Sequence, residues 1–279
     1  MKKLYISADM EGIGGIVSHS ECYPQEDSVG YERAVALMNR EVSVVAVAAL
    51  EAGVTELVVN DAHGPMTNLR AELLPKQVKL LSGKPKICAM EAGLDETFDA
   101  AFLIGYHARA GALNGVIAHT FHDRIFEVSV NGKVLGESGV NAYYASLVHQ
   151  VPIIFASGDA AFCEEVTELL PTLETVCTKT GLGYAAALNR DEAGLFTEYR
   201  DTVKQVLTQS KTKKPSLLKM RTPYVLQVTF IHPVAADIVM HMPGWTRIDG
   251  RAVEYTAQDF QELYQALQSS YAILAYRQQ

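Results

Sequence analysis

The sequence contains no apolar run that approaches the roughly 20 residues needed to cross a bilayer, which argues against a membrane-spanning protein. It also contains no C-x-x-C pair. The cysteines are irregularly spaced, and this favours reduced, mostly buried thiols over a disulfide framework, a metal site or a nucleophile. They are Cys22, Cys88, Cys163 and Cys177.

Phosphate-binding motifs are missing as well. There is no P-loop, and the "GIGG" at 12–15 lacks both the G-x-G-x-x-G spacing and an acidic residue placed for a ribose. Positive charge is scarce, because 24 Lys and Arg face 32 Asp and Glu, for a net charge of -8. Such an acidic chain is a poor partner for nucleic acid or for an anionic membrane surface.

The N-terminal segment does not fit a secretory signal. Lys2 and Lys3 precede a short apolar stretch, but Asp9 interrupts it and no small-residue cleavage site follows. We therefore expect a cytoplasmic protein. With 279 residues, 48% of them hydrophobic, the chain can bury a sizeable core in one large domain or two unequal ones.

Short β-branched runs alternate with helical stretches in the first half of the chain. The pattern predicts a helix at 31–53, ending at Gly53, and strands at 4–8, 55–60, 78–83 and 98–108. This order is typical of an α/β fold with a mostly parallel sheet flanked by helices. Beyond it, Asn131-Gly132 lies between alternating apolar residues and predicts a hairpin.

The remaining elements suggest a second, smaller unit. We predict a strand at 151–159 and helices at 140–150, 161–171 and 191–209, then a strand at 224–231 and a closing helix at 256–277. The polar, basic segment "QSKTKKPSLLK" separates these groups. We therefore expect a catalytic, metal-binding α/β domain over 1–210 and a smaller C-terminal α+β domain over 211–279.

Several strands end in residue types that bind metals. Ligands of parallel α/β sheets gather beyond the carboxyl ends of the strands, and side chains two apart on an extended segment point to one side. Strand 4–8 leads into Asp9 and Glu11, strand 55–60 into Asp61 and His63, the run "AFLIGY" into His107, and the hairpin into Glu137.

Two histidines and three carboxylates suit one or two divalent ions, with zinc favoured and manganese or cobalt as alternatives. A carboxylate can bridge two such ions about 3.5–4 Å apart, so that both activate one water. Each residue alone also has an ordinary explanation: Asp9 as a cap, Glu11 and Glu137 as turn charges, His63 in a loop, His107 in the core. Their coincidence at successive strand ends favours a metallo-hydrolase.

A further histidine, His119, follows the apolar "GVIA". Near a metal-bound water it would act as a general acid or base, or stabilise a developing oxyanion. His122 and Asp123 lie close by and compete for that role, and sequence spacing does not choose among them.

The motifs "SADMEG", "NDAHG", "GYHARAG", "GVIAHT" and "GESGVNAYYA" occur in one chain and in this order. Together they resemble the zinc-dependent D-aminopeptidases of peptidase family M55. The similarity is dense over residues 3–160 and loose beyond, where "MPG" is shared. The segment "HTFHDRIFEV" departs from the family pattern, which puts substrate preference in doubt.

The resemblance implies a two-domain subunit with two zinc ions, a self-compartmentalising decamer of two stacked five-fold rings, and release of N-terminal D-residues such as D-alanine from short peptides. It implies Asp9 as a bridging ligand and His119 as the catalytic histidine. The further ligands that it implies are Glu11, His63, His107 and Glu137.

The expected mechanism is attack of a metal-activated water on the first peptide carbonyl, with His119 assisting the intermediate or the leaving amine. Asp61, Arg109 and Asn141 are candidate substrate contacts, and the free α-amino group has either a carboxylate such as Asp61 or a metal as its partner. The alternative is a metallo-hydrolase of another class, acting on an L-peptide, a cyclic amide or a phosphoester. A non-catalytic shell that binds peptide or stores metal is a weaker alternative, because the ligand set is complete.

Overall fold

The structure is a computed structural model that describes residues 1–210, 212 and 215–275. A seven-stranded sheet forms the larger part, in the order β3-β2-β1-β4-β7-β8-β9. All its neighbouring strands are parallel except β8 and β9, which confirms the predicted fold class. Its strands are β1 (Lys3–Ala8), β2 (Glu56–Asp61), β3 (Val78–Leu81), β4 (Ala100–Tyr106), β7 (Ile153–Asp159), β8 (Glu174–Gly183) and β9 (Ala186–Asn189).

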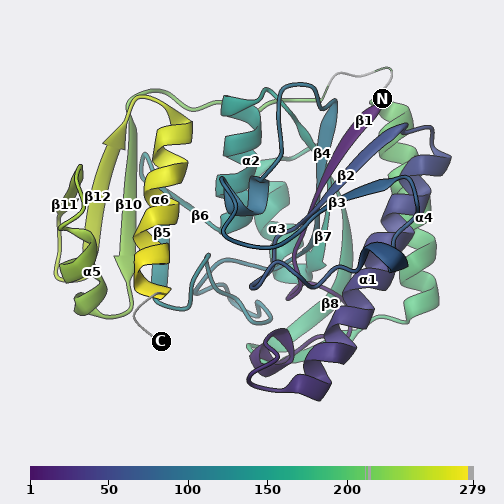
Figure 1. The fold of residues 1–279 in the computed structure, drawn as a ribbon, viewed down its shortest axis with the longest axis horizontal. Coiled ribbons are helices and arrows are strands. Elements are labelled where there is room, and N and C mark those ends of the chain that lie inside the picture. The colour runs from purple at the N-terminus through teal and green to yellow at the C-terminus, as the bar shows by residue number, and fades with distance from the viewer. Residues whose placement is uncertain (211, 213–214, 276–279) are drawn as a thin grey trace.

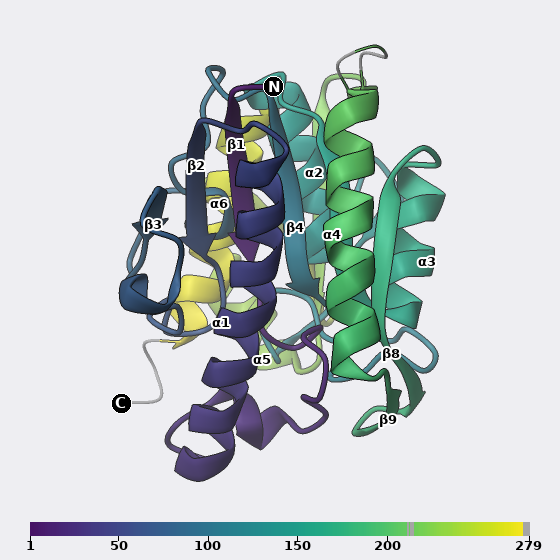
Figure 2. The same cartoon turned by 90° about the vertical axis from the view of Figure 1, so that its right-hand side faces the viewer.

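Helices cover both faces of this sheet (Figures 1 and 2). One face carries α1 (Ser28–Glu51) and α4 (Glu192–Gln209), and the other carries α2 (Glu137–Val148) and α3 (Ala160–Leu169). Strands buried on both faces are expected to be apolar throughout, and β4 and β7 are buried at every position. Short 3-10 turns interrupt the loops at η1 (His19–Cys22), η2 (Ala71–Leu73) and η3 (Ala89–Glu91).

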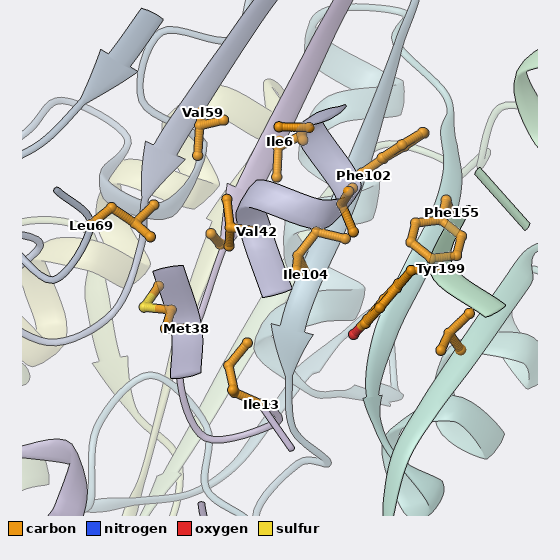
Figure 3. Close-up of a cluster of buried hydrophobic side chains, with 14 of the residues drawn as sticks. Ile6, Ile13, Met38, Val42, Val59, Leu69, Phe102, Ile104, Phe155 and Tyr199 are labelled. Carbon is orange, nitrogen blue, oxygen red and sulfur yellow. The ribbon is translucent and has the colours of Figure 1, made fainter. Parts of the chain in front are cut away.

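A hydrophobic core lies between the large sheet and the helices α1 and α4 (Figure 3). It holds in place the strands whose ends form the candidate site. Ile6 of β1 and Phe102 of β4 lie in one buried cluster with Val42 of α1 and Tyr199 of α4. Side chains of this size each contribute about 1.5–3 kcal/mol when fully buried. The Asp27 carboxylate caps α1 by accepting a hydrogen bond from the Gly30 amide at 2.9 Å.

A second, antiparallel sheet has the order β11-β12-β10-β5-β6. α6 (Phe260–Ala275) packs on β10, β12 and α2, and α5 (Pro233–Val239) lies beside it. The predicted hairpin is confirmed, with Asn131 and Gly132 both at positive φ. The strands are β5 (Ile125–Val130), β6 (Lys133–Leu135), β10 (Tyr224–Phe230), β11 (Trp245–Arg247) and β12 (Ala252–Ala257).

The structure differs from the sequence-based expectations in several places. β5 pairs with β10, so the second sheet takes strands from both sides of the expected boundary at 210. β12 occupies the start of the expected closing helix, and residues 276 and 277 of that helix lie outside the described residues, as do 211, 213 and 214 at the boundary. β8 and β9 were not predicted. Glu137 is the first residue of α2 rather than the end of the hairpin.

No helix in the part of the chain that the structure describes is long and apolar enough to cross a membrane.

Candidate metal centre

Three neighbouring strands bring the predicted ligands to one edge of the large sheet. β1 lies between β2 and β4, and the register places Ala8 beside both Asp61 and Ile104. Because the three strands are parallel, the residues that follow them meet beyond one edge. Asp9, His63 and His107 are these residues, as the sequence predicted.

The turn after β1 needs glycine. The Gly12 amide donates to the Gly105 carbonyl at 2.8 Å, which folds the chain tightly over the end of β4. A Cβ on Gly12 would lie 1.8 Å from the Tyr106 carbonyl oxygen, so no other residue fits here. The close approach of the turn to β4 brings Glu11 back over the edge of the sheet.

A buried lysine that the sequence analysis missed holds the same loop. Lys179 on β8 is completely buried, and its ammonium donates to the carbonyls of Glu11, Ile13 and Ile16 at 2.5, 2.8 and 2.5 Å. Burial lowers the pKa of Lys179 to about 8, with nearby Asp159 and Glu41 acting in the opposite direction. The sequence gives no clear signal for this role, because the segment around Lys179 lacks the apolar periodicity of a buried strand.

Asp9 lies between His63 and His107, the two histidines predicted as ligands. Its Oδ1 is 3.3 Å from Nδ1 of His63, and its Oδ2 is 3.5 Å from Nε2 of His107. Glu11 Oε2 is 2.9 Å from the same His63 nitrogen, and Glu137 Oε1 is 3.4 Å from the same His107 nitrogen. All five residues are at most 3% exposed.

Backbone carbonyls fix the orientation of the histidine rings. Because a carbonyl only accepts, the nitrogen that faces it must carry the proton. His63 donates from Nε2 to the Cys22 carbonyl at 3.0 Å, and His107 from Nδ1 to the Ala108 carbonyl at 3.0 Å. The opposite nitrogen of each ring faces the carboxylates, and metal-ligating histidines are likewise oriented by a carbonyl that accepts from their other nitrogen.

Several ligand atoms lack any partner among the described residues. Asp9 Oδ2, both Glu11 oxygens and His107 Nε2 are buried and make no hydrogen bond. Buried carboxylates without partners are costly, and a cation removes that cost.

The pKa values of Asp9 and His63 are both shifted by burial and by the close packing of these charged groups. Burial, followed by the charge of Glu11, raises the pKa of Asp9 to about 7. Burial lowers the pKa of His63, but Glu11 and Asp9 outweigh it and the pKa lies well above its usual value. The donor set of carboxylates and imidazoles therefore fits zinc or a similar divalent ion.

His119 lies against this group. Its ring stacks on that of His107 with centroids 4.1 Å apart, and its Nδ1 donates to the Ile117 carbonyl at 2.9 Å. Ile117 adopts φ 53°, a strained conformation for a β-branched residue. Burial, followed by the charge of His107, lowers the pKa of His119, which favours the neutral ring. His122 instead pairs with Asp123 at 2.5 Å and belongs to none of the ligand groups.

Asp61, a predicted substrate contact, supports a loop. Its carboxylate is buried and accepts from the amides of Asn68 and Leu69 at 2.6 and 2.7 Å, and from the Asn68 side chain at 2.8 Å. Asn68 also donates to the carbonyl of His63 at 2.8 Å. This arrangement favours a positioning role for Asp61 beneath His63.

The other two predicted contacts lie on the α2 side. Asn141, one helical turn after Glu137, is buried; it donates to the Tyr106 hydroxyl at 3.2 Å and accepts from the Tyr264 hydroxyl at 2.8 Å. Arg109 is half-buried, and its guanidinium donates to the Ala110 carbonyl at 3.2 Å. Of the three predicted contacts, Arg109 is therefore the most accessible.

Comparison with known proteins finds the same family over nearly the whole chain. The family model for peptidase M55, described as D-aminopeptidase, matches residues 1–269. A D-aminopeptidase of Bacillus subtilis (strain 168) is 35% identical over 269 residues, which are 95% of each chain. A solved structure described as the Zn-dependent D-aminopeptidase DppA from Bacillus subtilis, a self-compartmentalizing protease, matches with a TM-score of 0.90 and 32% identity over 97% of each chain.

Proposed function

Because this chain belongs to the M55 family of D-aminopeptidases, we propose that it releases the N-terminal D-residue of short peptides with a pair of zinc ions in each subunit. The observation that supports two ions rather than one is the position of Asp9, whose two carboxylate oxygens face two different histidines. Asp9 would bridge the ions. Glu11 and His63 would hold one ion, and His107 and Glu137 the other.

The two ions, when bound, would lower the pKa of a water molecule towards neutrality and polarise the peptide carbonyl. Manganese and cobalt accept the same donors and are alternatives to zinc. The carboxylate ligands would be held in fixed positions, because Asp9 and Glu11 follow the edge of the sheet and Glu137 lies in the first turn of α2. The site would thus be preorganised before substrate arrives.

His119 would be the proton-transfer residue. Its Nδ1–H is held by the Ile117 carbonyl, which leaves Nε2 free to accept a proton. Its lowered pKa keeps the ring neutral at pH 7, as a general base requires. The protonated ring would then donate to the leaving amine.

Arg109 is the proposed substrate contact among the three predicted. Its half-buried guanidinium matches the C-terminal carboxylate of a short peptide, which arginine binds with two parallel hydrogen bonds. Asn141 would act through Tyr106, which precedes the ligand His107. Asp61 would act through the His63 loop rather than on the α-amino group.

We also propose that the chain assembles as a decamer of two stacked five-fold rings and works in the cytoplasm. Exposed apolar side chains support an assembly: Leu113 is 86% exposed, and Leu182, Tyr184 and Leu188 of the adjoining β8–β9 region are 72%, 55% and 69% exposed. The Ile117 amide donates to the Tyr184 carbonyl at 2.8 Å, so the loop that follows Leu113 lies against the β8–β9 hairpin. Light scattering after size exclusion would give the mass of about ten 30.5 kDa subunits; a monomer would contradict the assembly.

A substrate panel tests the activity. Zinc-loaded protein is offered D-Ala-D-Ala, L-Ala-L-Ala, a cyclic amide and a phosphate monoester, and the released products are quantified. Cleavage of the D-peptide at the highest kcat/KM supports the proposal. Preference for any other member would identify a different substrate class for the same centre.

A further inference from the structure

Cys22 is a fully buried residue at the end of η1, next to the proposed metal centre but outside the proposed ligand set. Its Sγ, a carboxylate oxygen of Glu11 and a ring nitrogen of His63 all lie within 4.8 Å of one another. Thiolate, imidazole and carboxylate groups each bind zinc in proteins. Cysteine was not favoured as a ligand on sequence, because the four cysteines are irregularly spaced and form no C-x-x-C pair.

The backbone ties Cys22 to this place. The Cys22 carbonyl accepts the Nε2–H of His63 at 3.0 Å, and the ring of the next residue, Tyr23, lies 5.5 Å from the His63 ring. Among the described residues, the hydrogen-bond partner of the thiol is the Ser18 carbonyl, at a long 3.7 Å. His63 therefore ties the backbone of Cys22 to the site, whereas the sulfur itself is held only weakly by hydrogen bonding.

Glu11 supplies an independent indication of a cation here. Both of its carboxylate oxygens are buried and accept no hydrogen bond from the described residues, although Oε2 lies 2.9 Å from His63 Nδ1. A cation among Glu11, His63 and Cys22 would satisfy the carboxylate and the sulfur together. The competing explanation is that Cys22 only fills space, since it also contacts the apolar core beneath α1.

We propose that Cys22 Sγ is a further ligand of the ion held by Glu11 and His63, and that it makes this half of the centre selective for thiophilic ions such as zinc over manganese. This inference rests on the proposed zinc centre. Binding replaces the S–H bond with a metal–sulfur bond and releases the proton to solvent. Thiolate ligands select zinc, whereas carboxylate sites suit manganese.

Zinc-edge X-ray absorption of the fully zinc-loaded wild-type protein tests the proposal directly. We expect a sulfur shell at about 2.3 Å, distinct from nitrogen and oxygen at about 2.0–2.1 Å. Cys22→Ser and Cys22→Ala should lose this shell, while Cys163→Ser, a buried cysteine on α3, should keep it. In competition between Zn²⁺ and Mn²⁺, Cys22→Ser should lose at least tenfold in zinc preference.

A wild-type spectrum without sulfur, or a sulfur shell that persists in Cys22→Ser, would overturn the proposal. Zinc content and D-Ala-D-Ala cleavage are measured on the same samples. Two bound ions and normal cleavage without a sulfur shell would reject only the role of Cys22 as a ligand and leave the proposed function intact. Failure to bind zinc at all would reject both the role of Cys22 and the proposed function.

Discussion

At the scale of single residues, the candidate metal centre depends on side chains that are ordinary one by one and become a ligand set only where they meet. The sequence predicted that Asp9, His63 and His107 share a sheet edge, since each follows a parallel strand. Residue spacing alone did not place Asp9 between the histidines, because that depends on side-chain rotamers and on the turn at Gly12; only the family resemblance implied a bridging Asp9. Spacing also did not separate His119 from His122, because the choice depends on a loop strained at Ile117, and again only the resemblance favoured His119.

Replacing Asp9 tests the shared ligand. Asp9→Asn should lose both zinc ions, because the amide cannot supply a charged oxygen to each side. Glu137→Gln should lose only the ion on the His107 side. Metal per subunit, measured by elemental analysis after dialysis, distinguishes these outcomes. An Asp9→Asn protein that retains two ions would rule out the bridge.

Replacing His119 tests proton transfer. His119→Ala should keep both ions and lose roughly 10²–10⁴-fold in kcat, the usual contribution of general acid–base catalysis. His122→Ala is the matched control, because that ring pairs with Asp123 and should change kcat little. Loss of zinc from His119→Ala would instead make His119 a ligand.

At the scale of elements, the loop 9–16 is held by partners far away in sequence. Lys179 on β8 satisfies three of its carbonyls, and Glu41 on α1 accepts from the Gly14 amide at 2.7 Å. The β-branched runs predicted β1, β2, β4 and β7 because their pattern is local. β8 was not predicted, since its Lys179 and its glycines hide the apolar periodicity of a buried strand.

Removing the lysine should loosen the loop. Lys179→Met leaves three buried carbonyls without a donor and should lower the free energy of unfolding by about 3 kcal/mol. Zinc affinity should fall as well, because Glu11 loses its anchor. The control Lys204→Met changes an exposed residue of α4 and should alter neither quantity. Urea unfolding and zinc titration calorimetry measure the two effects, and unchanged zinc affinity in Lys179→Met would contradict the anchoring role.

At the scale of the whole molecule, two sheets share one chain in a way that local patterns do not reveal. Asn131-Gly132 predicted the β5–β6 hairpin, but the pairing of Gln227 on β10 with Ser129 on β5 joins segments about a hundred residues apart. The boundary expected at 210 does not separate the two sheets, because β5 pairs with β10. Pairing of distant strands depends on packing over the whole molecule.

Glu41 links α1, α4 and the site loop, and it should make stability depend on pH. It accepts from the Tyr199 hydroxyl at 2.7 Å, and burial raises its pKa from 4.5 to about 7. A carboxyl with a raised folded pKa stabilises the fold below its unfolded pKa, and this contribution is lost as pH rises through 7.

Wild-type protein should therefore lose on the order of 3 kcal/mol relative to Glu41→Gln between pH 5 and pH 8. Urea unfolding of both metal-free proteins across this range measures the difference, and the titration of the empty ligand site cancels between them. Parallel pH profiles would show that Glu41 does not titrate there.

The most direct test of the central claim is D-alanine release from D-Ala-D-Ala while metal-stripped protein is titrated with zinc. The account predicts no release without zinc, little with the first equivalent, and full activity as the second equivalent fills the Asp9-bridged centre, with L-Ala-L-Ala left intact. Full activity at one equivalent would contradict the paired centre. Absence of D-alanine release at two bound equivalents would contradict the proposed reaction.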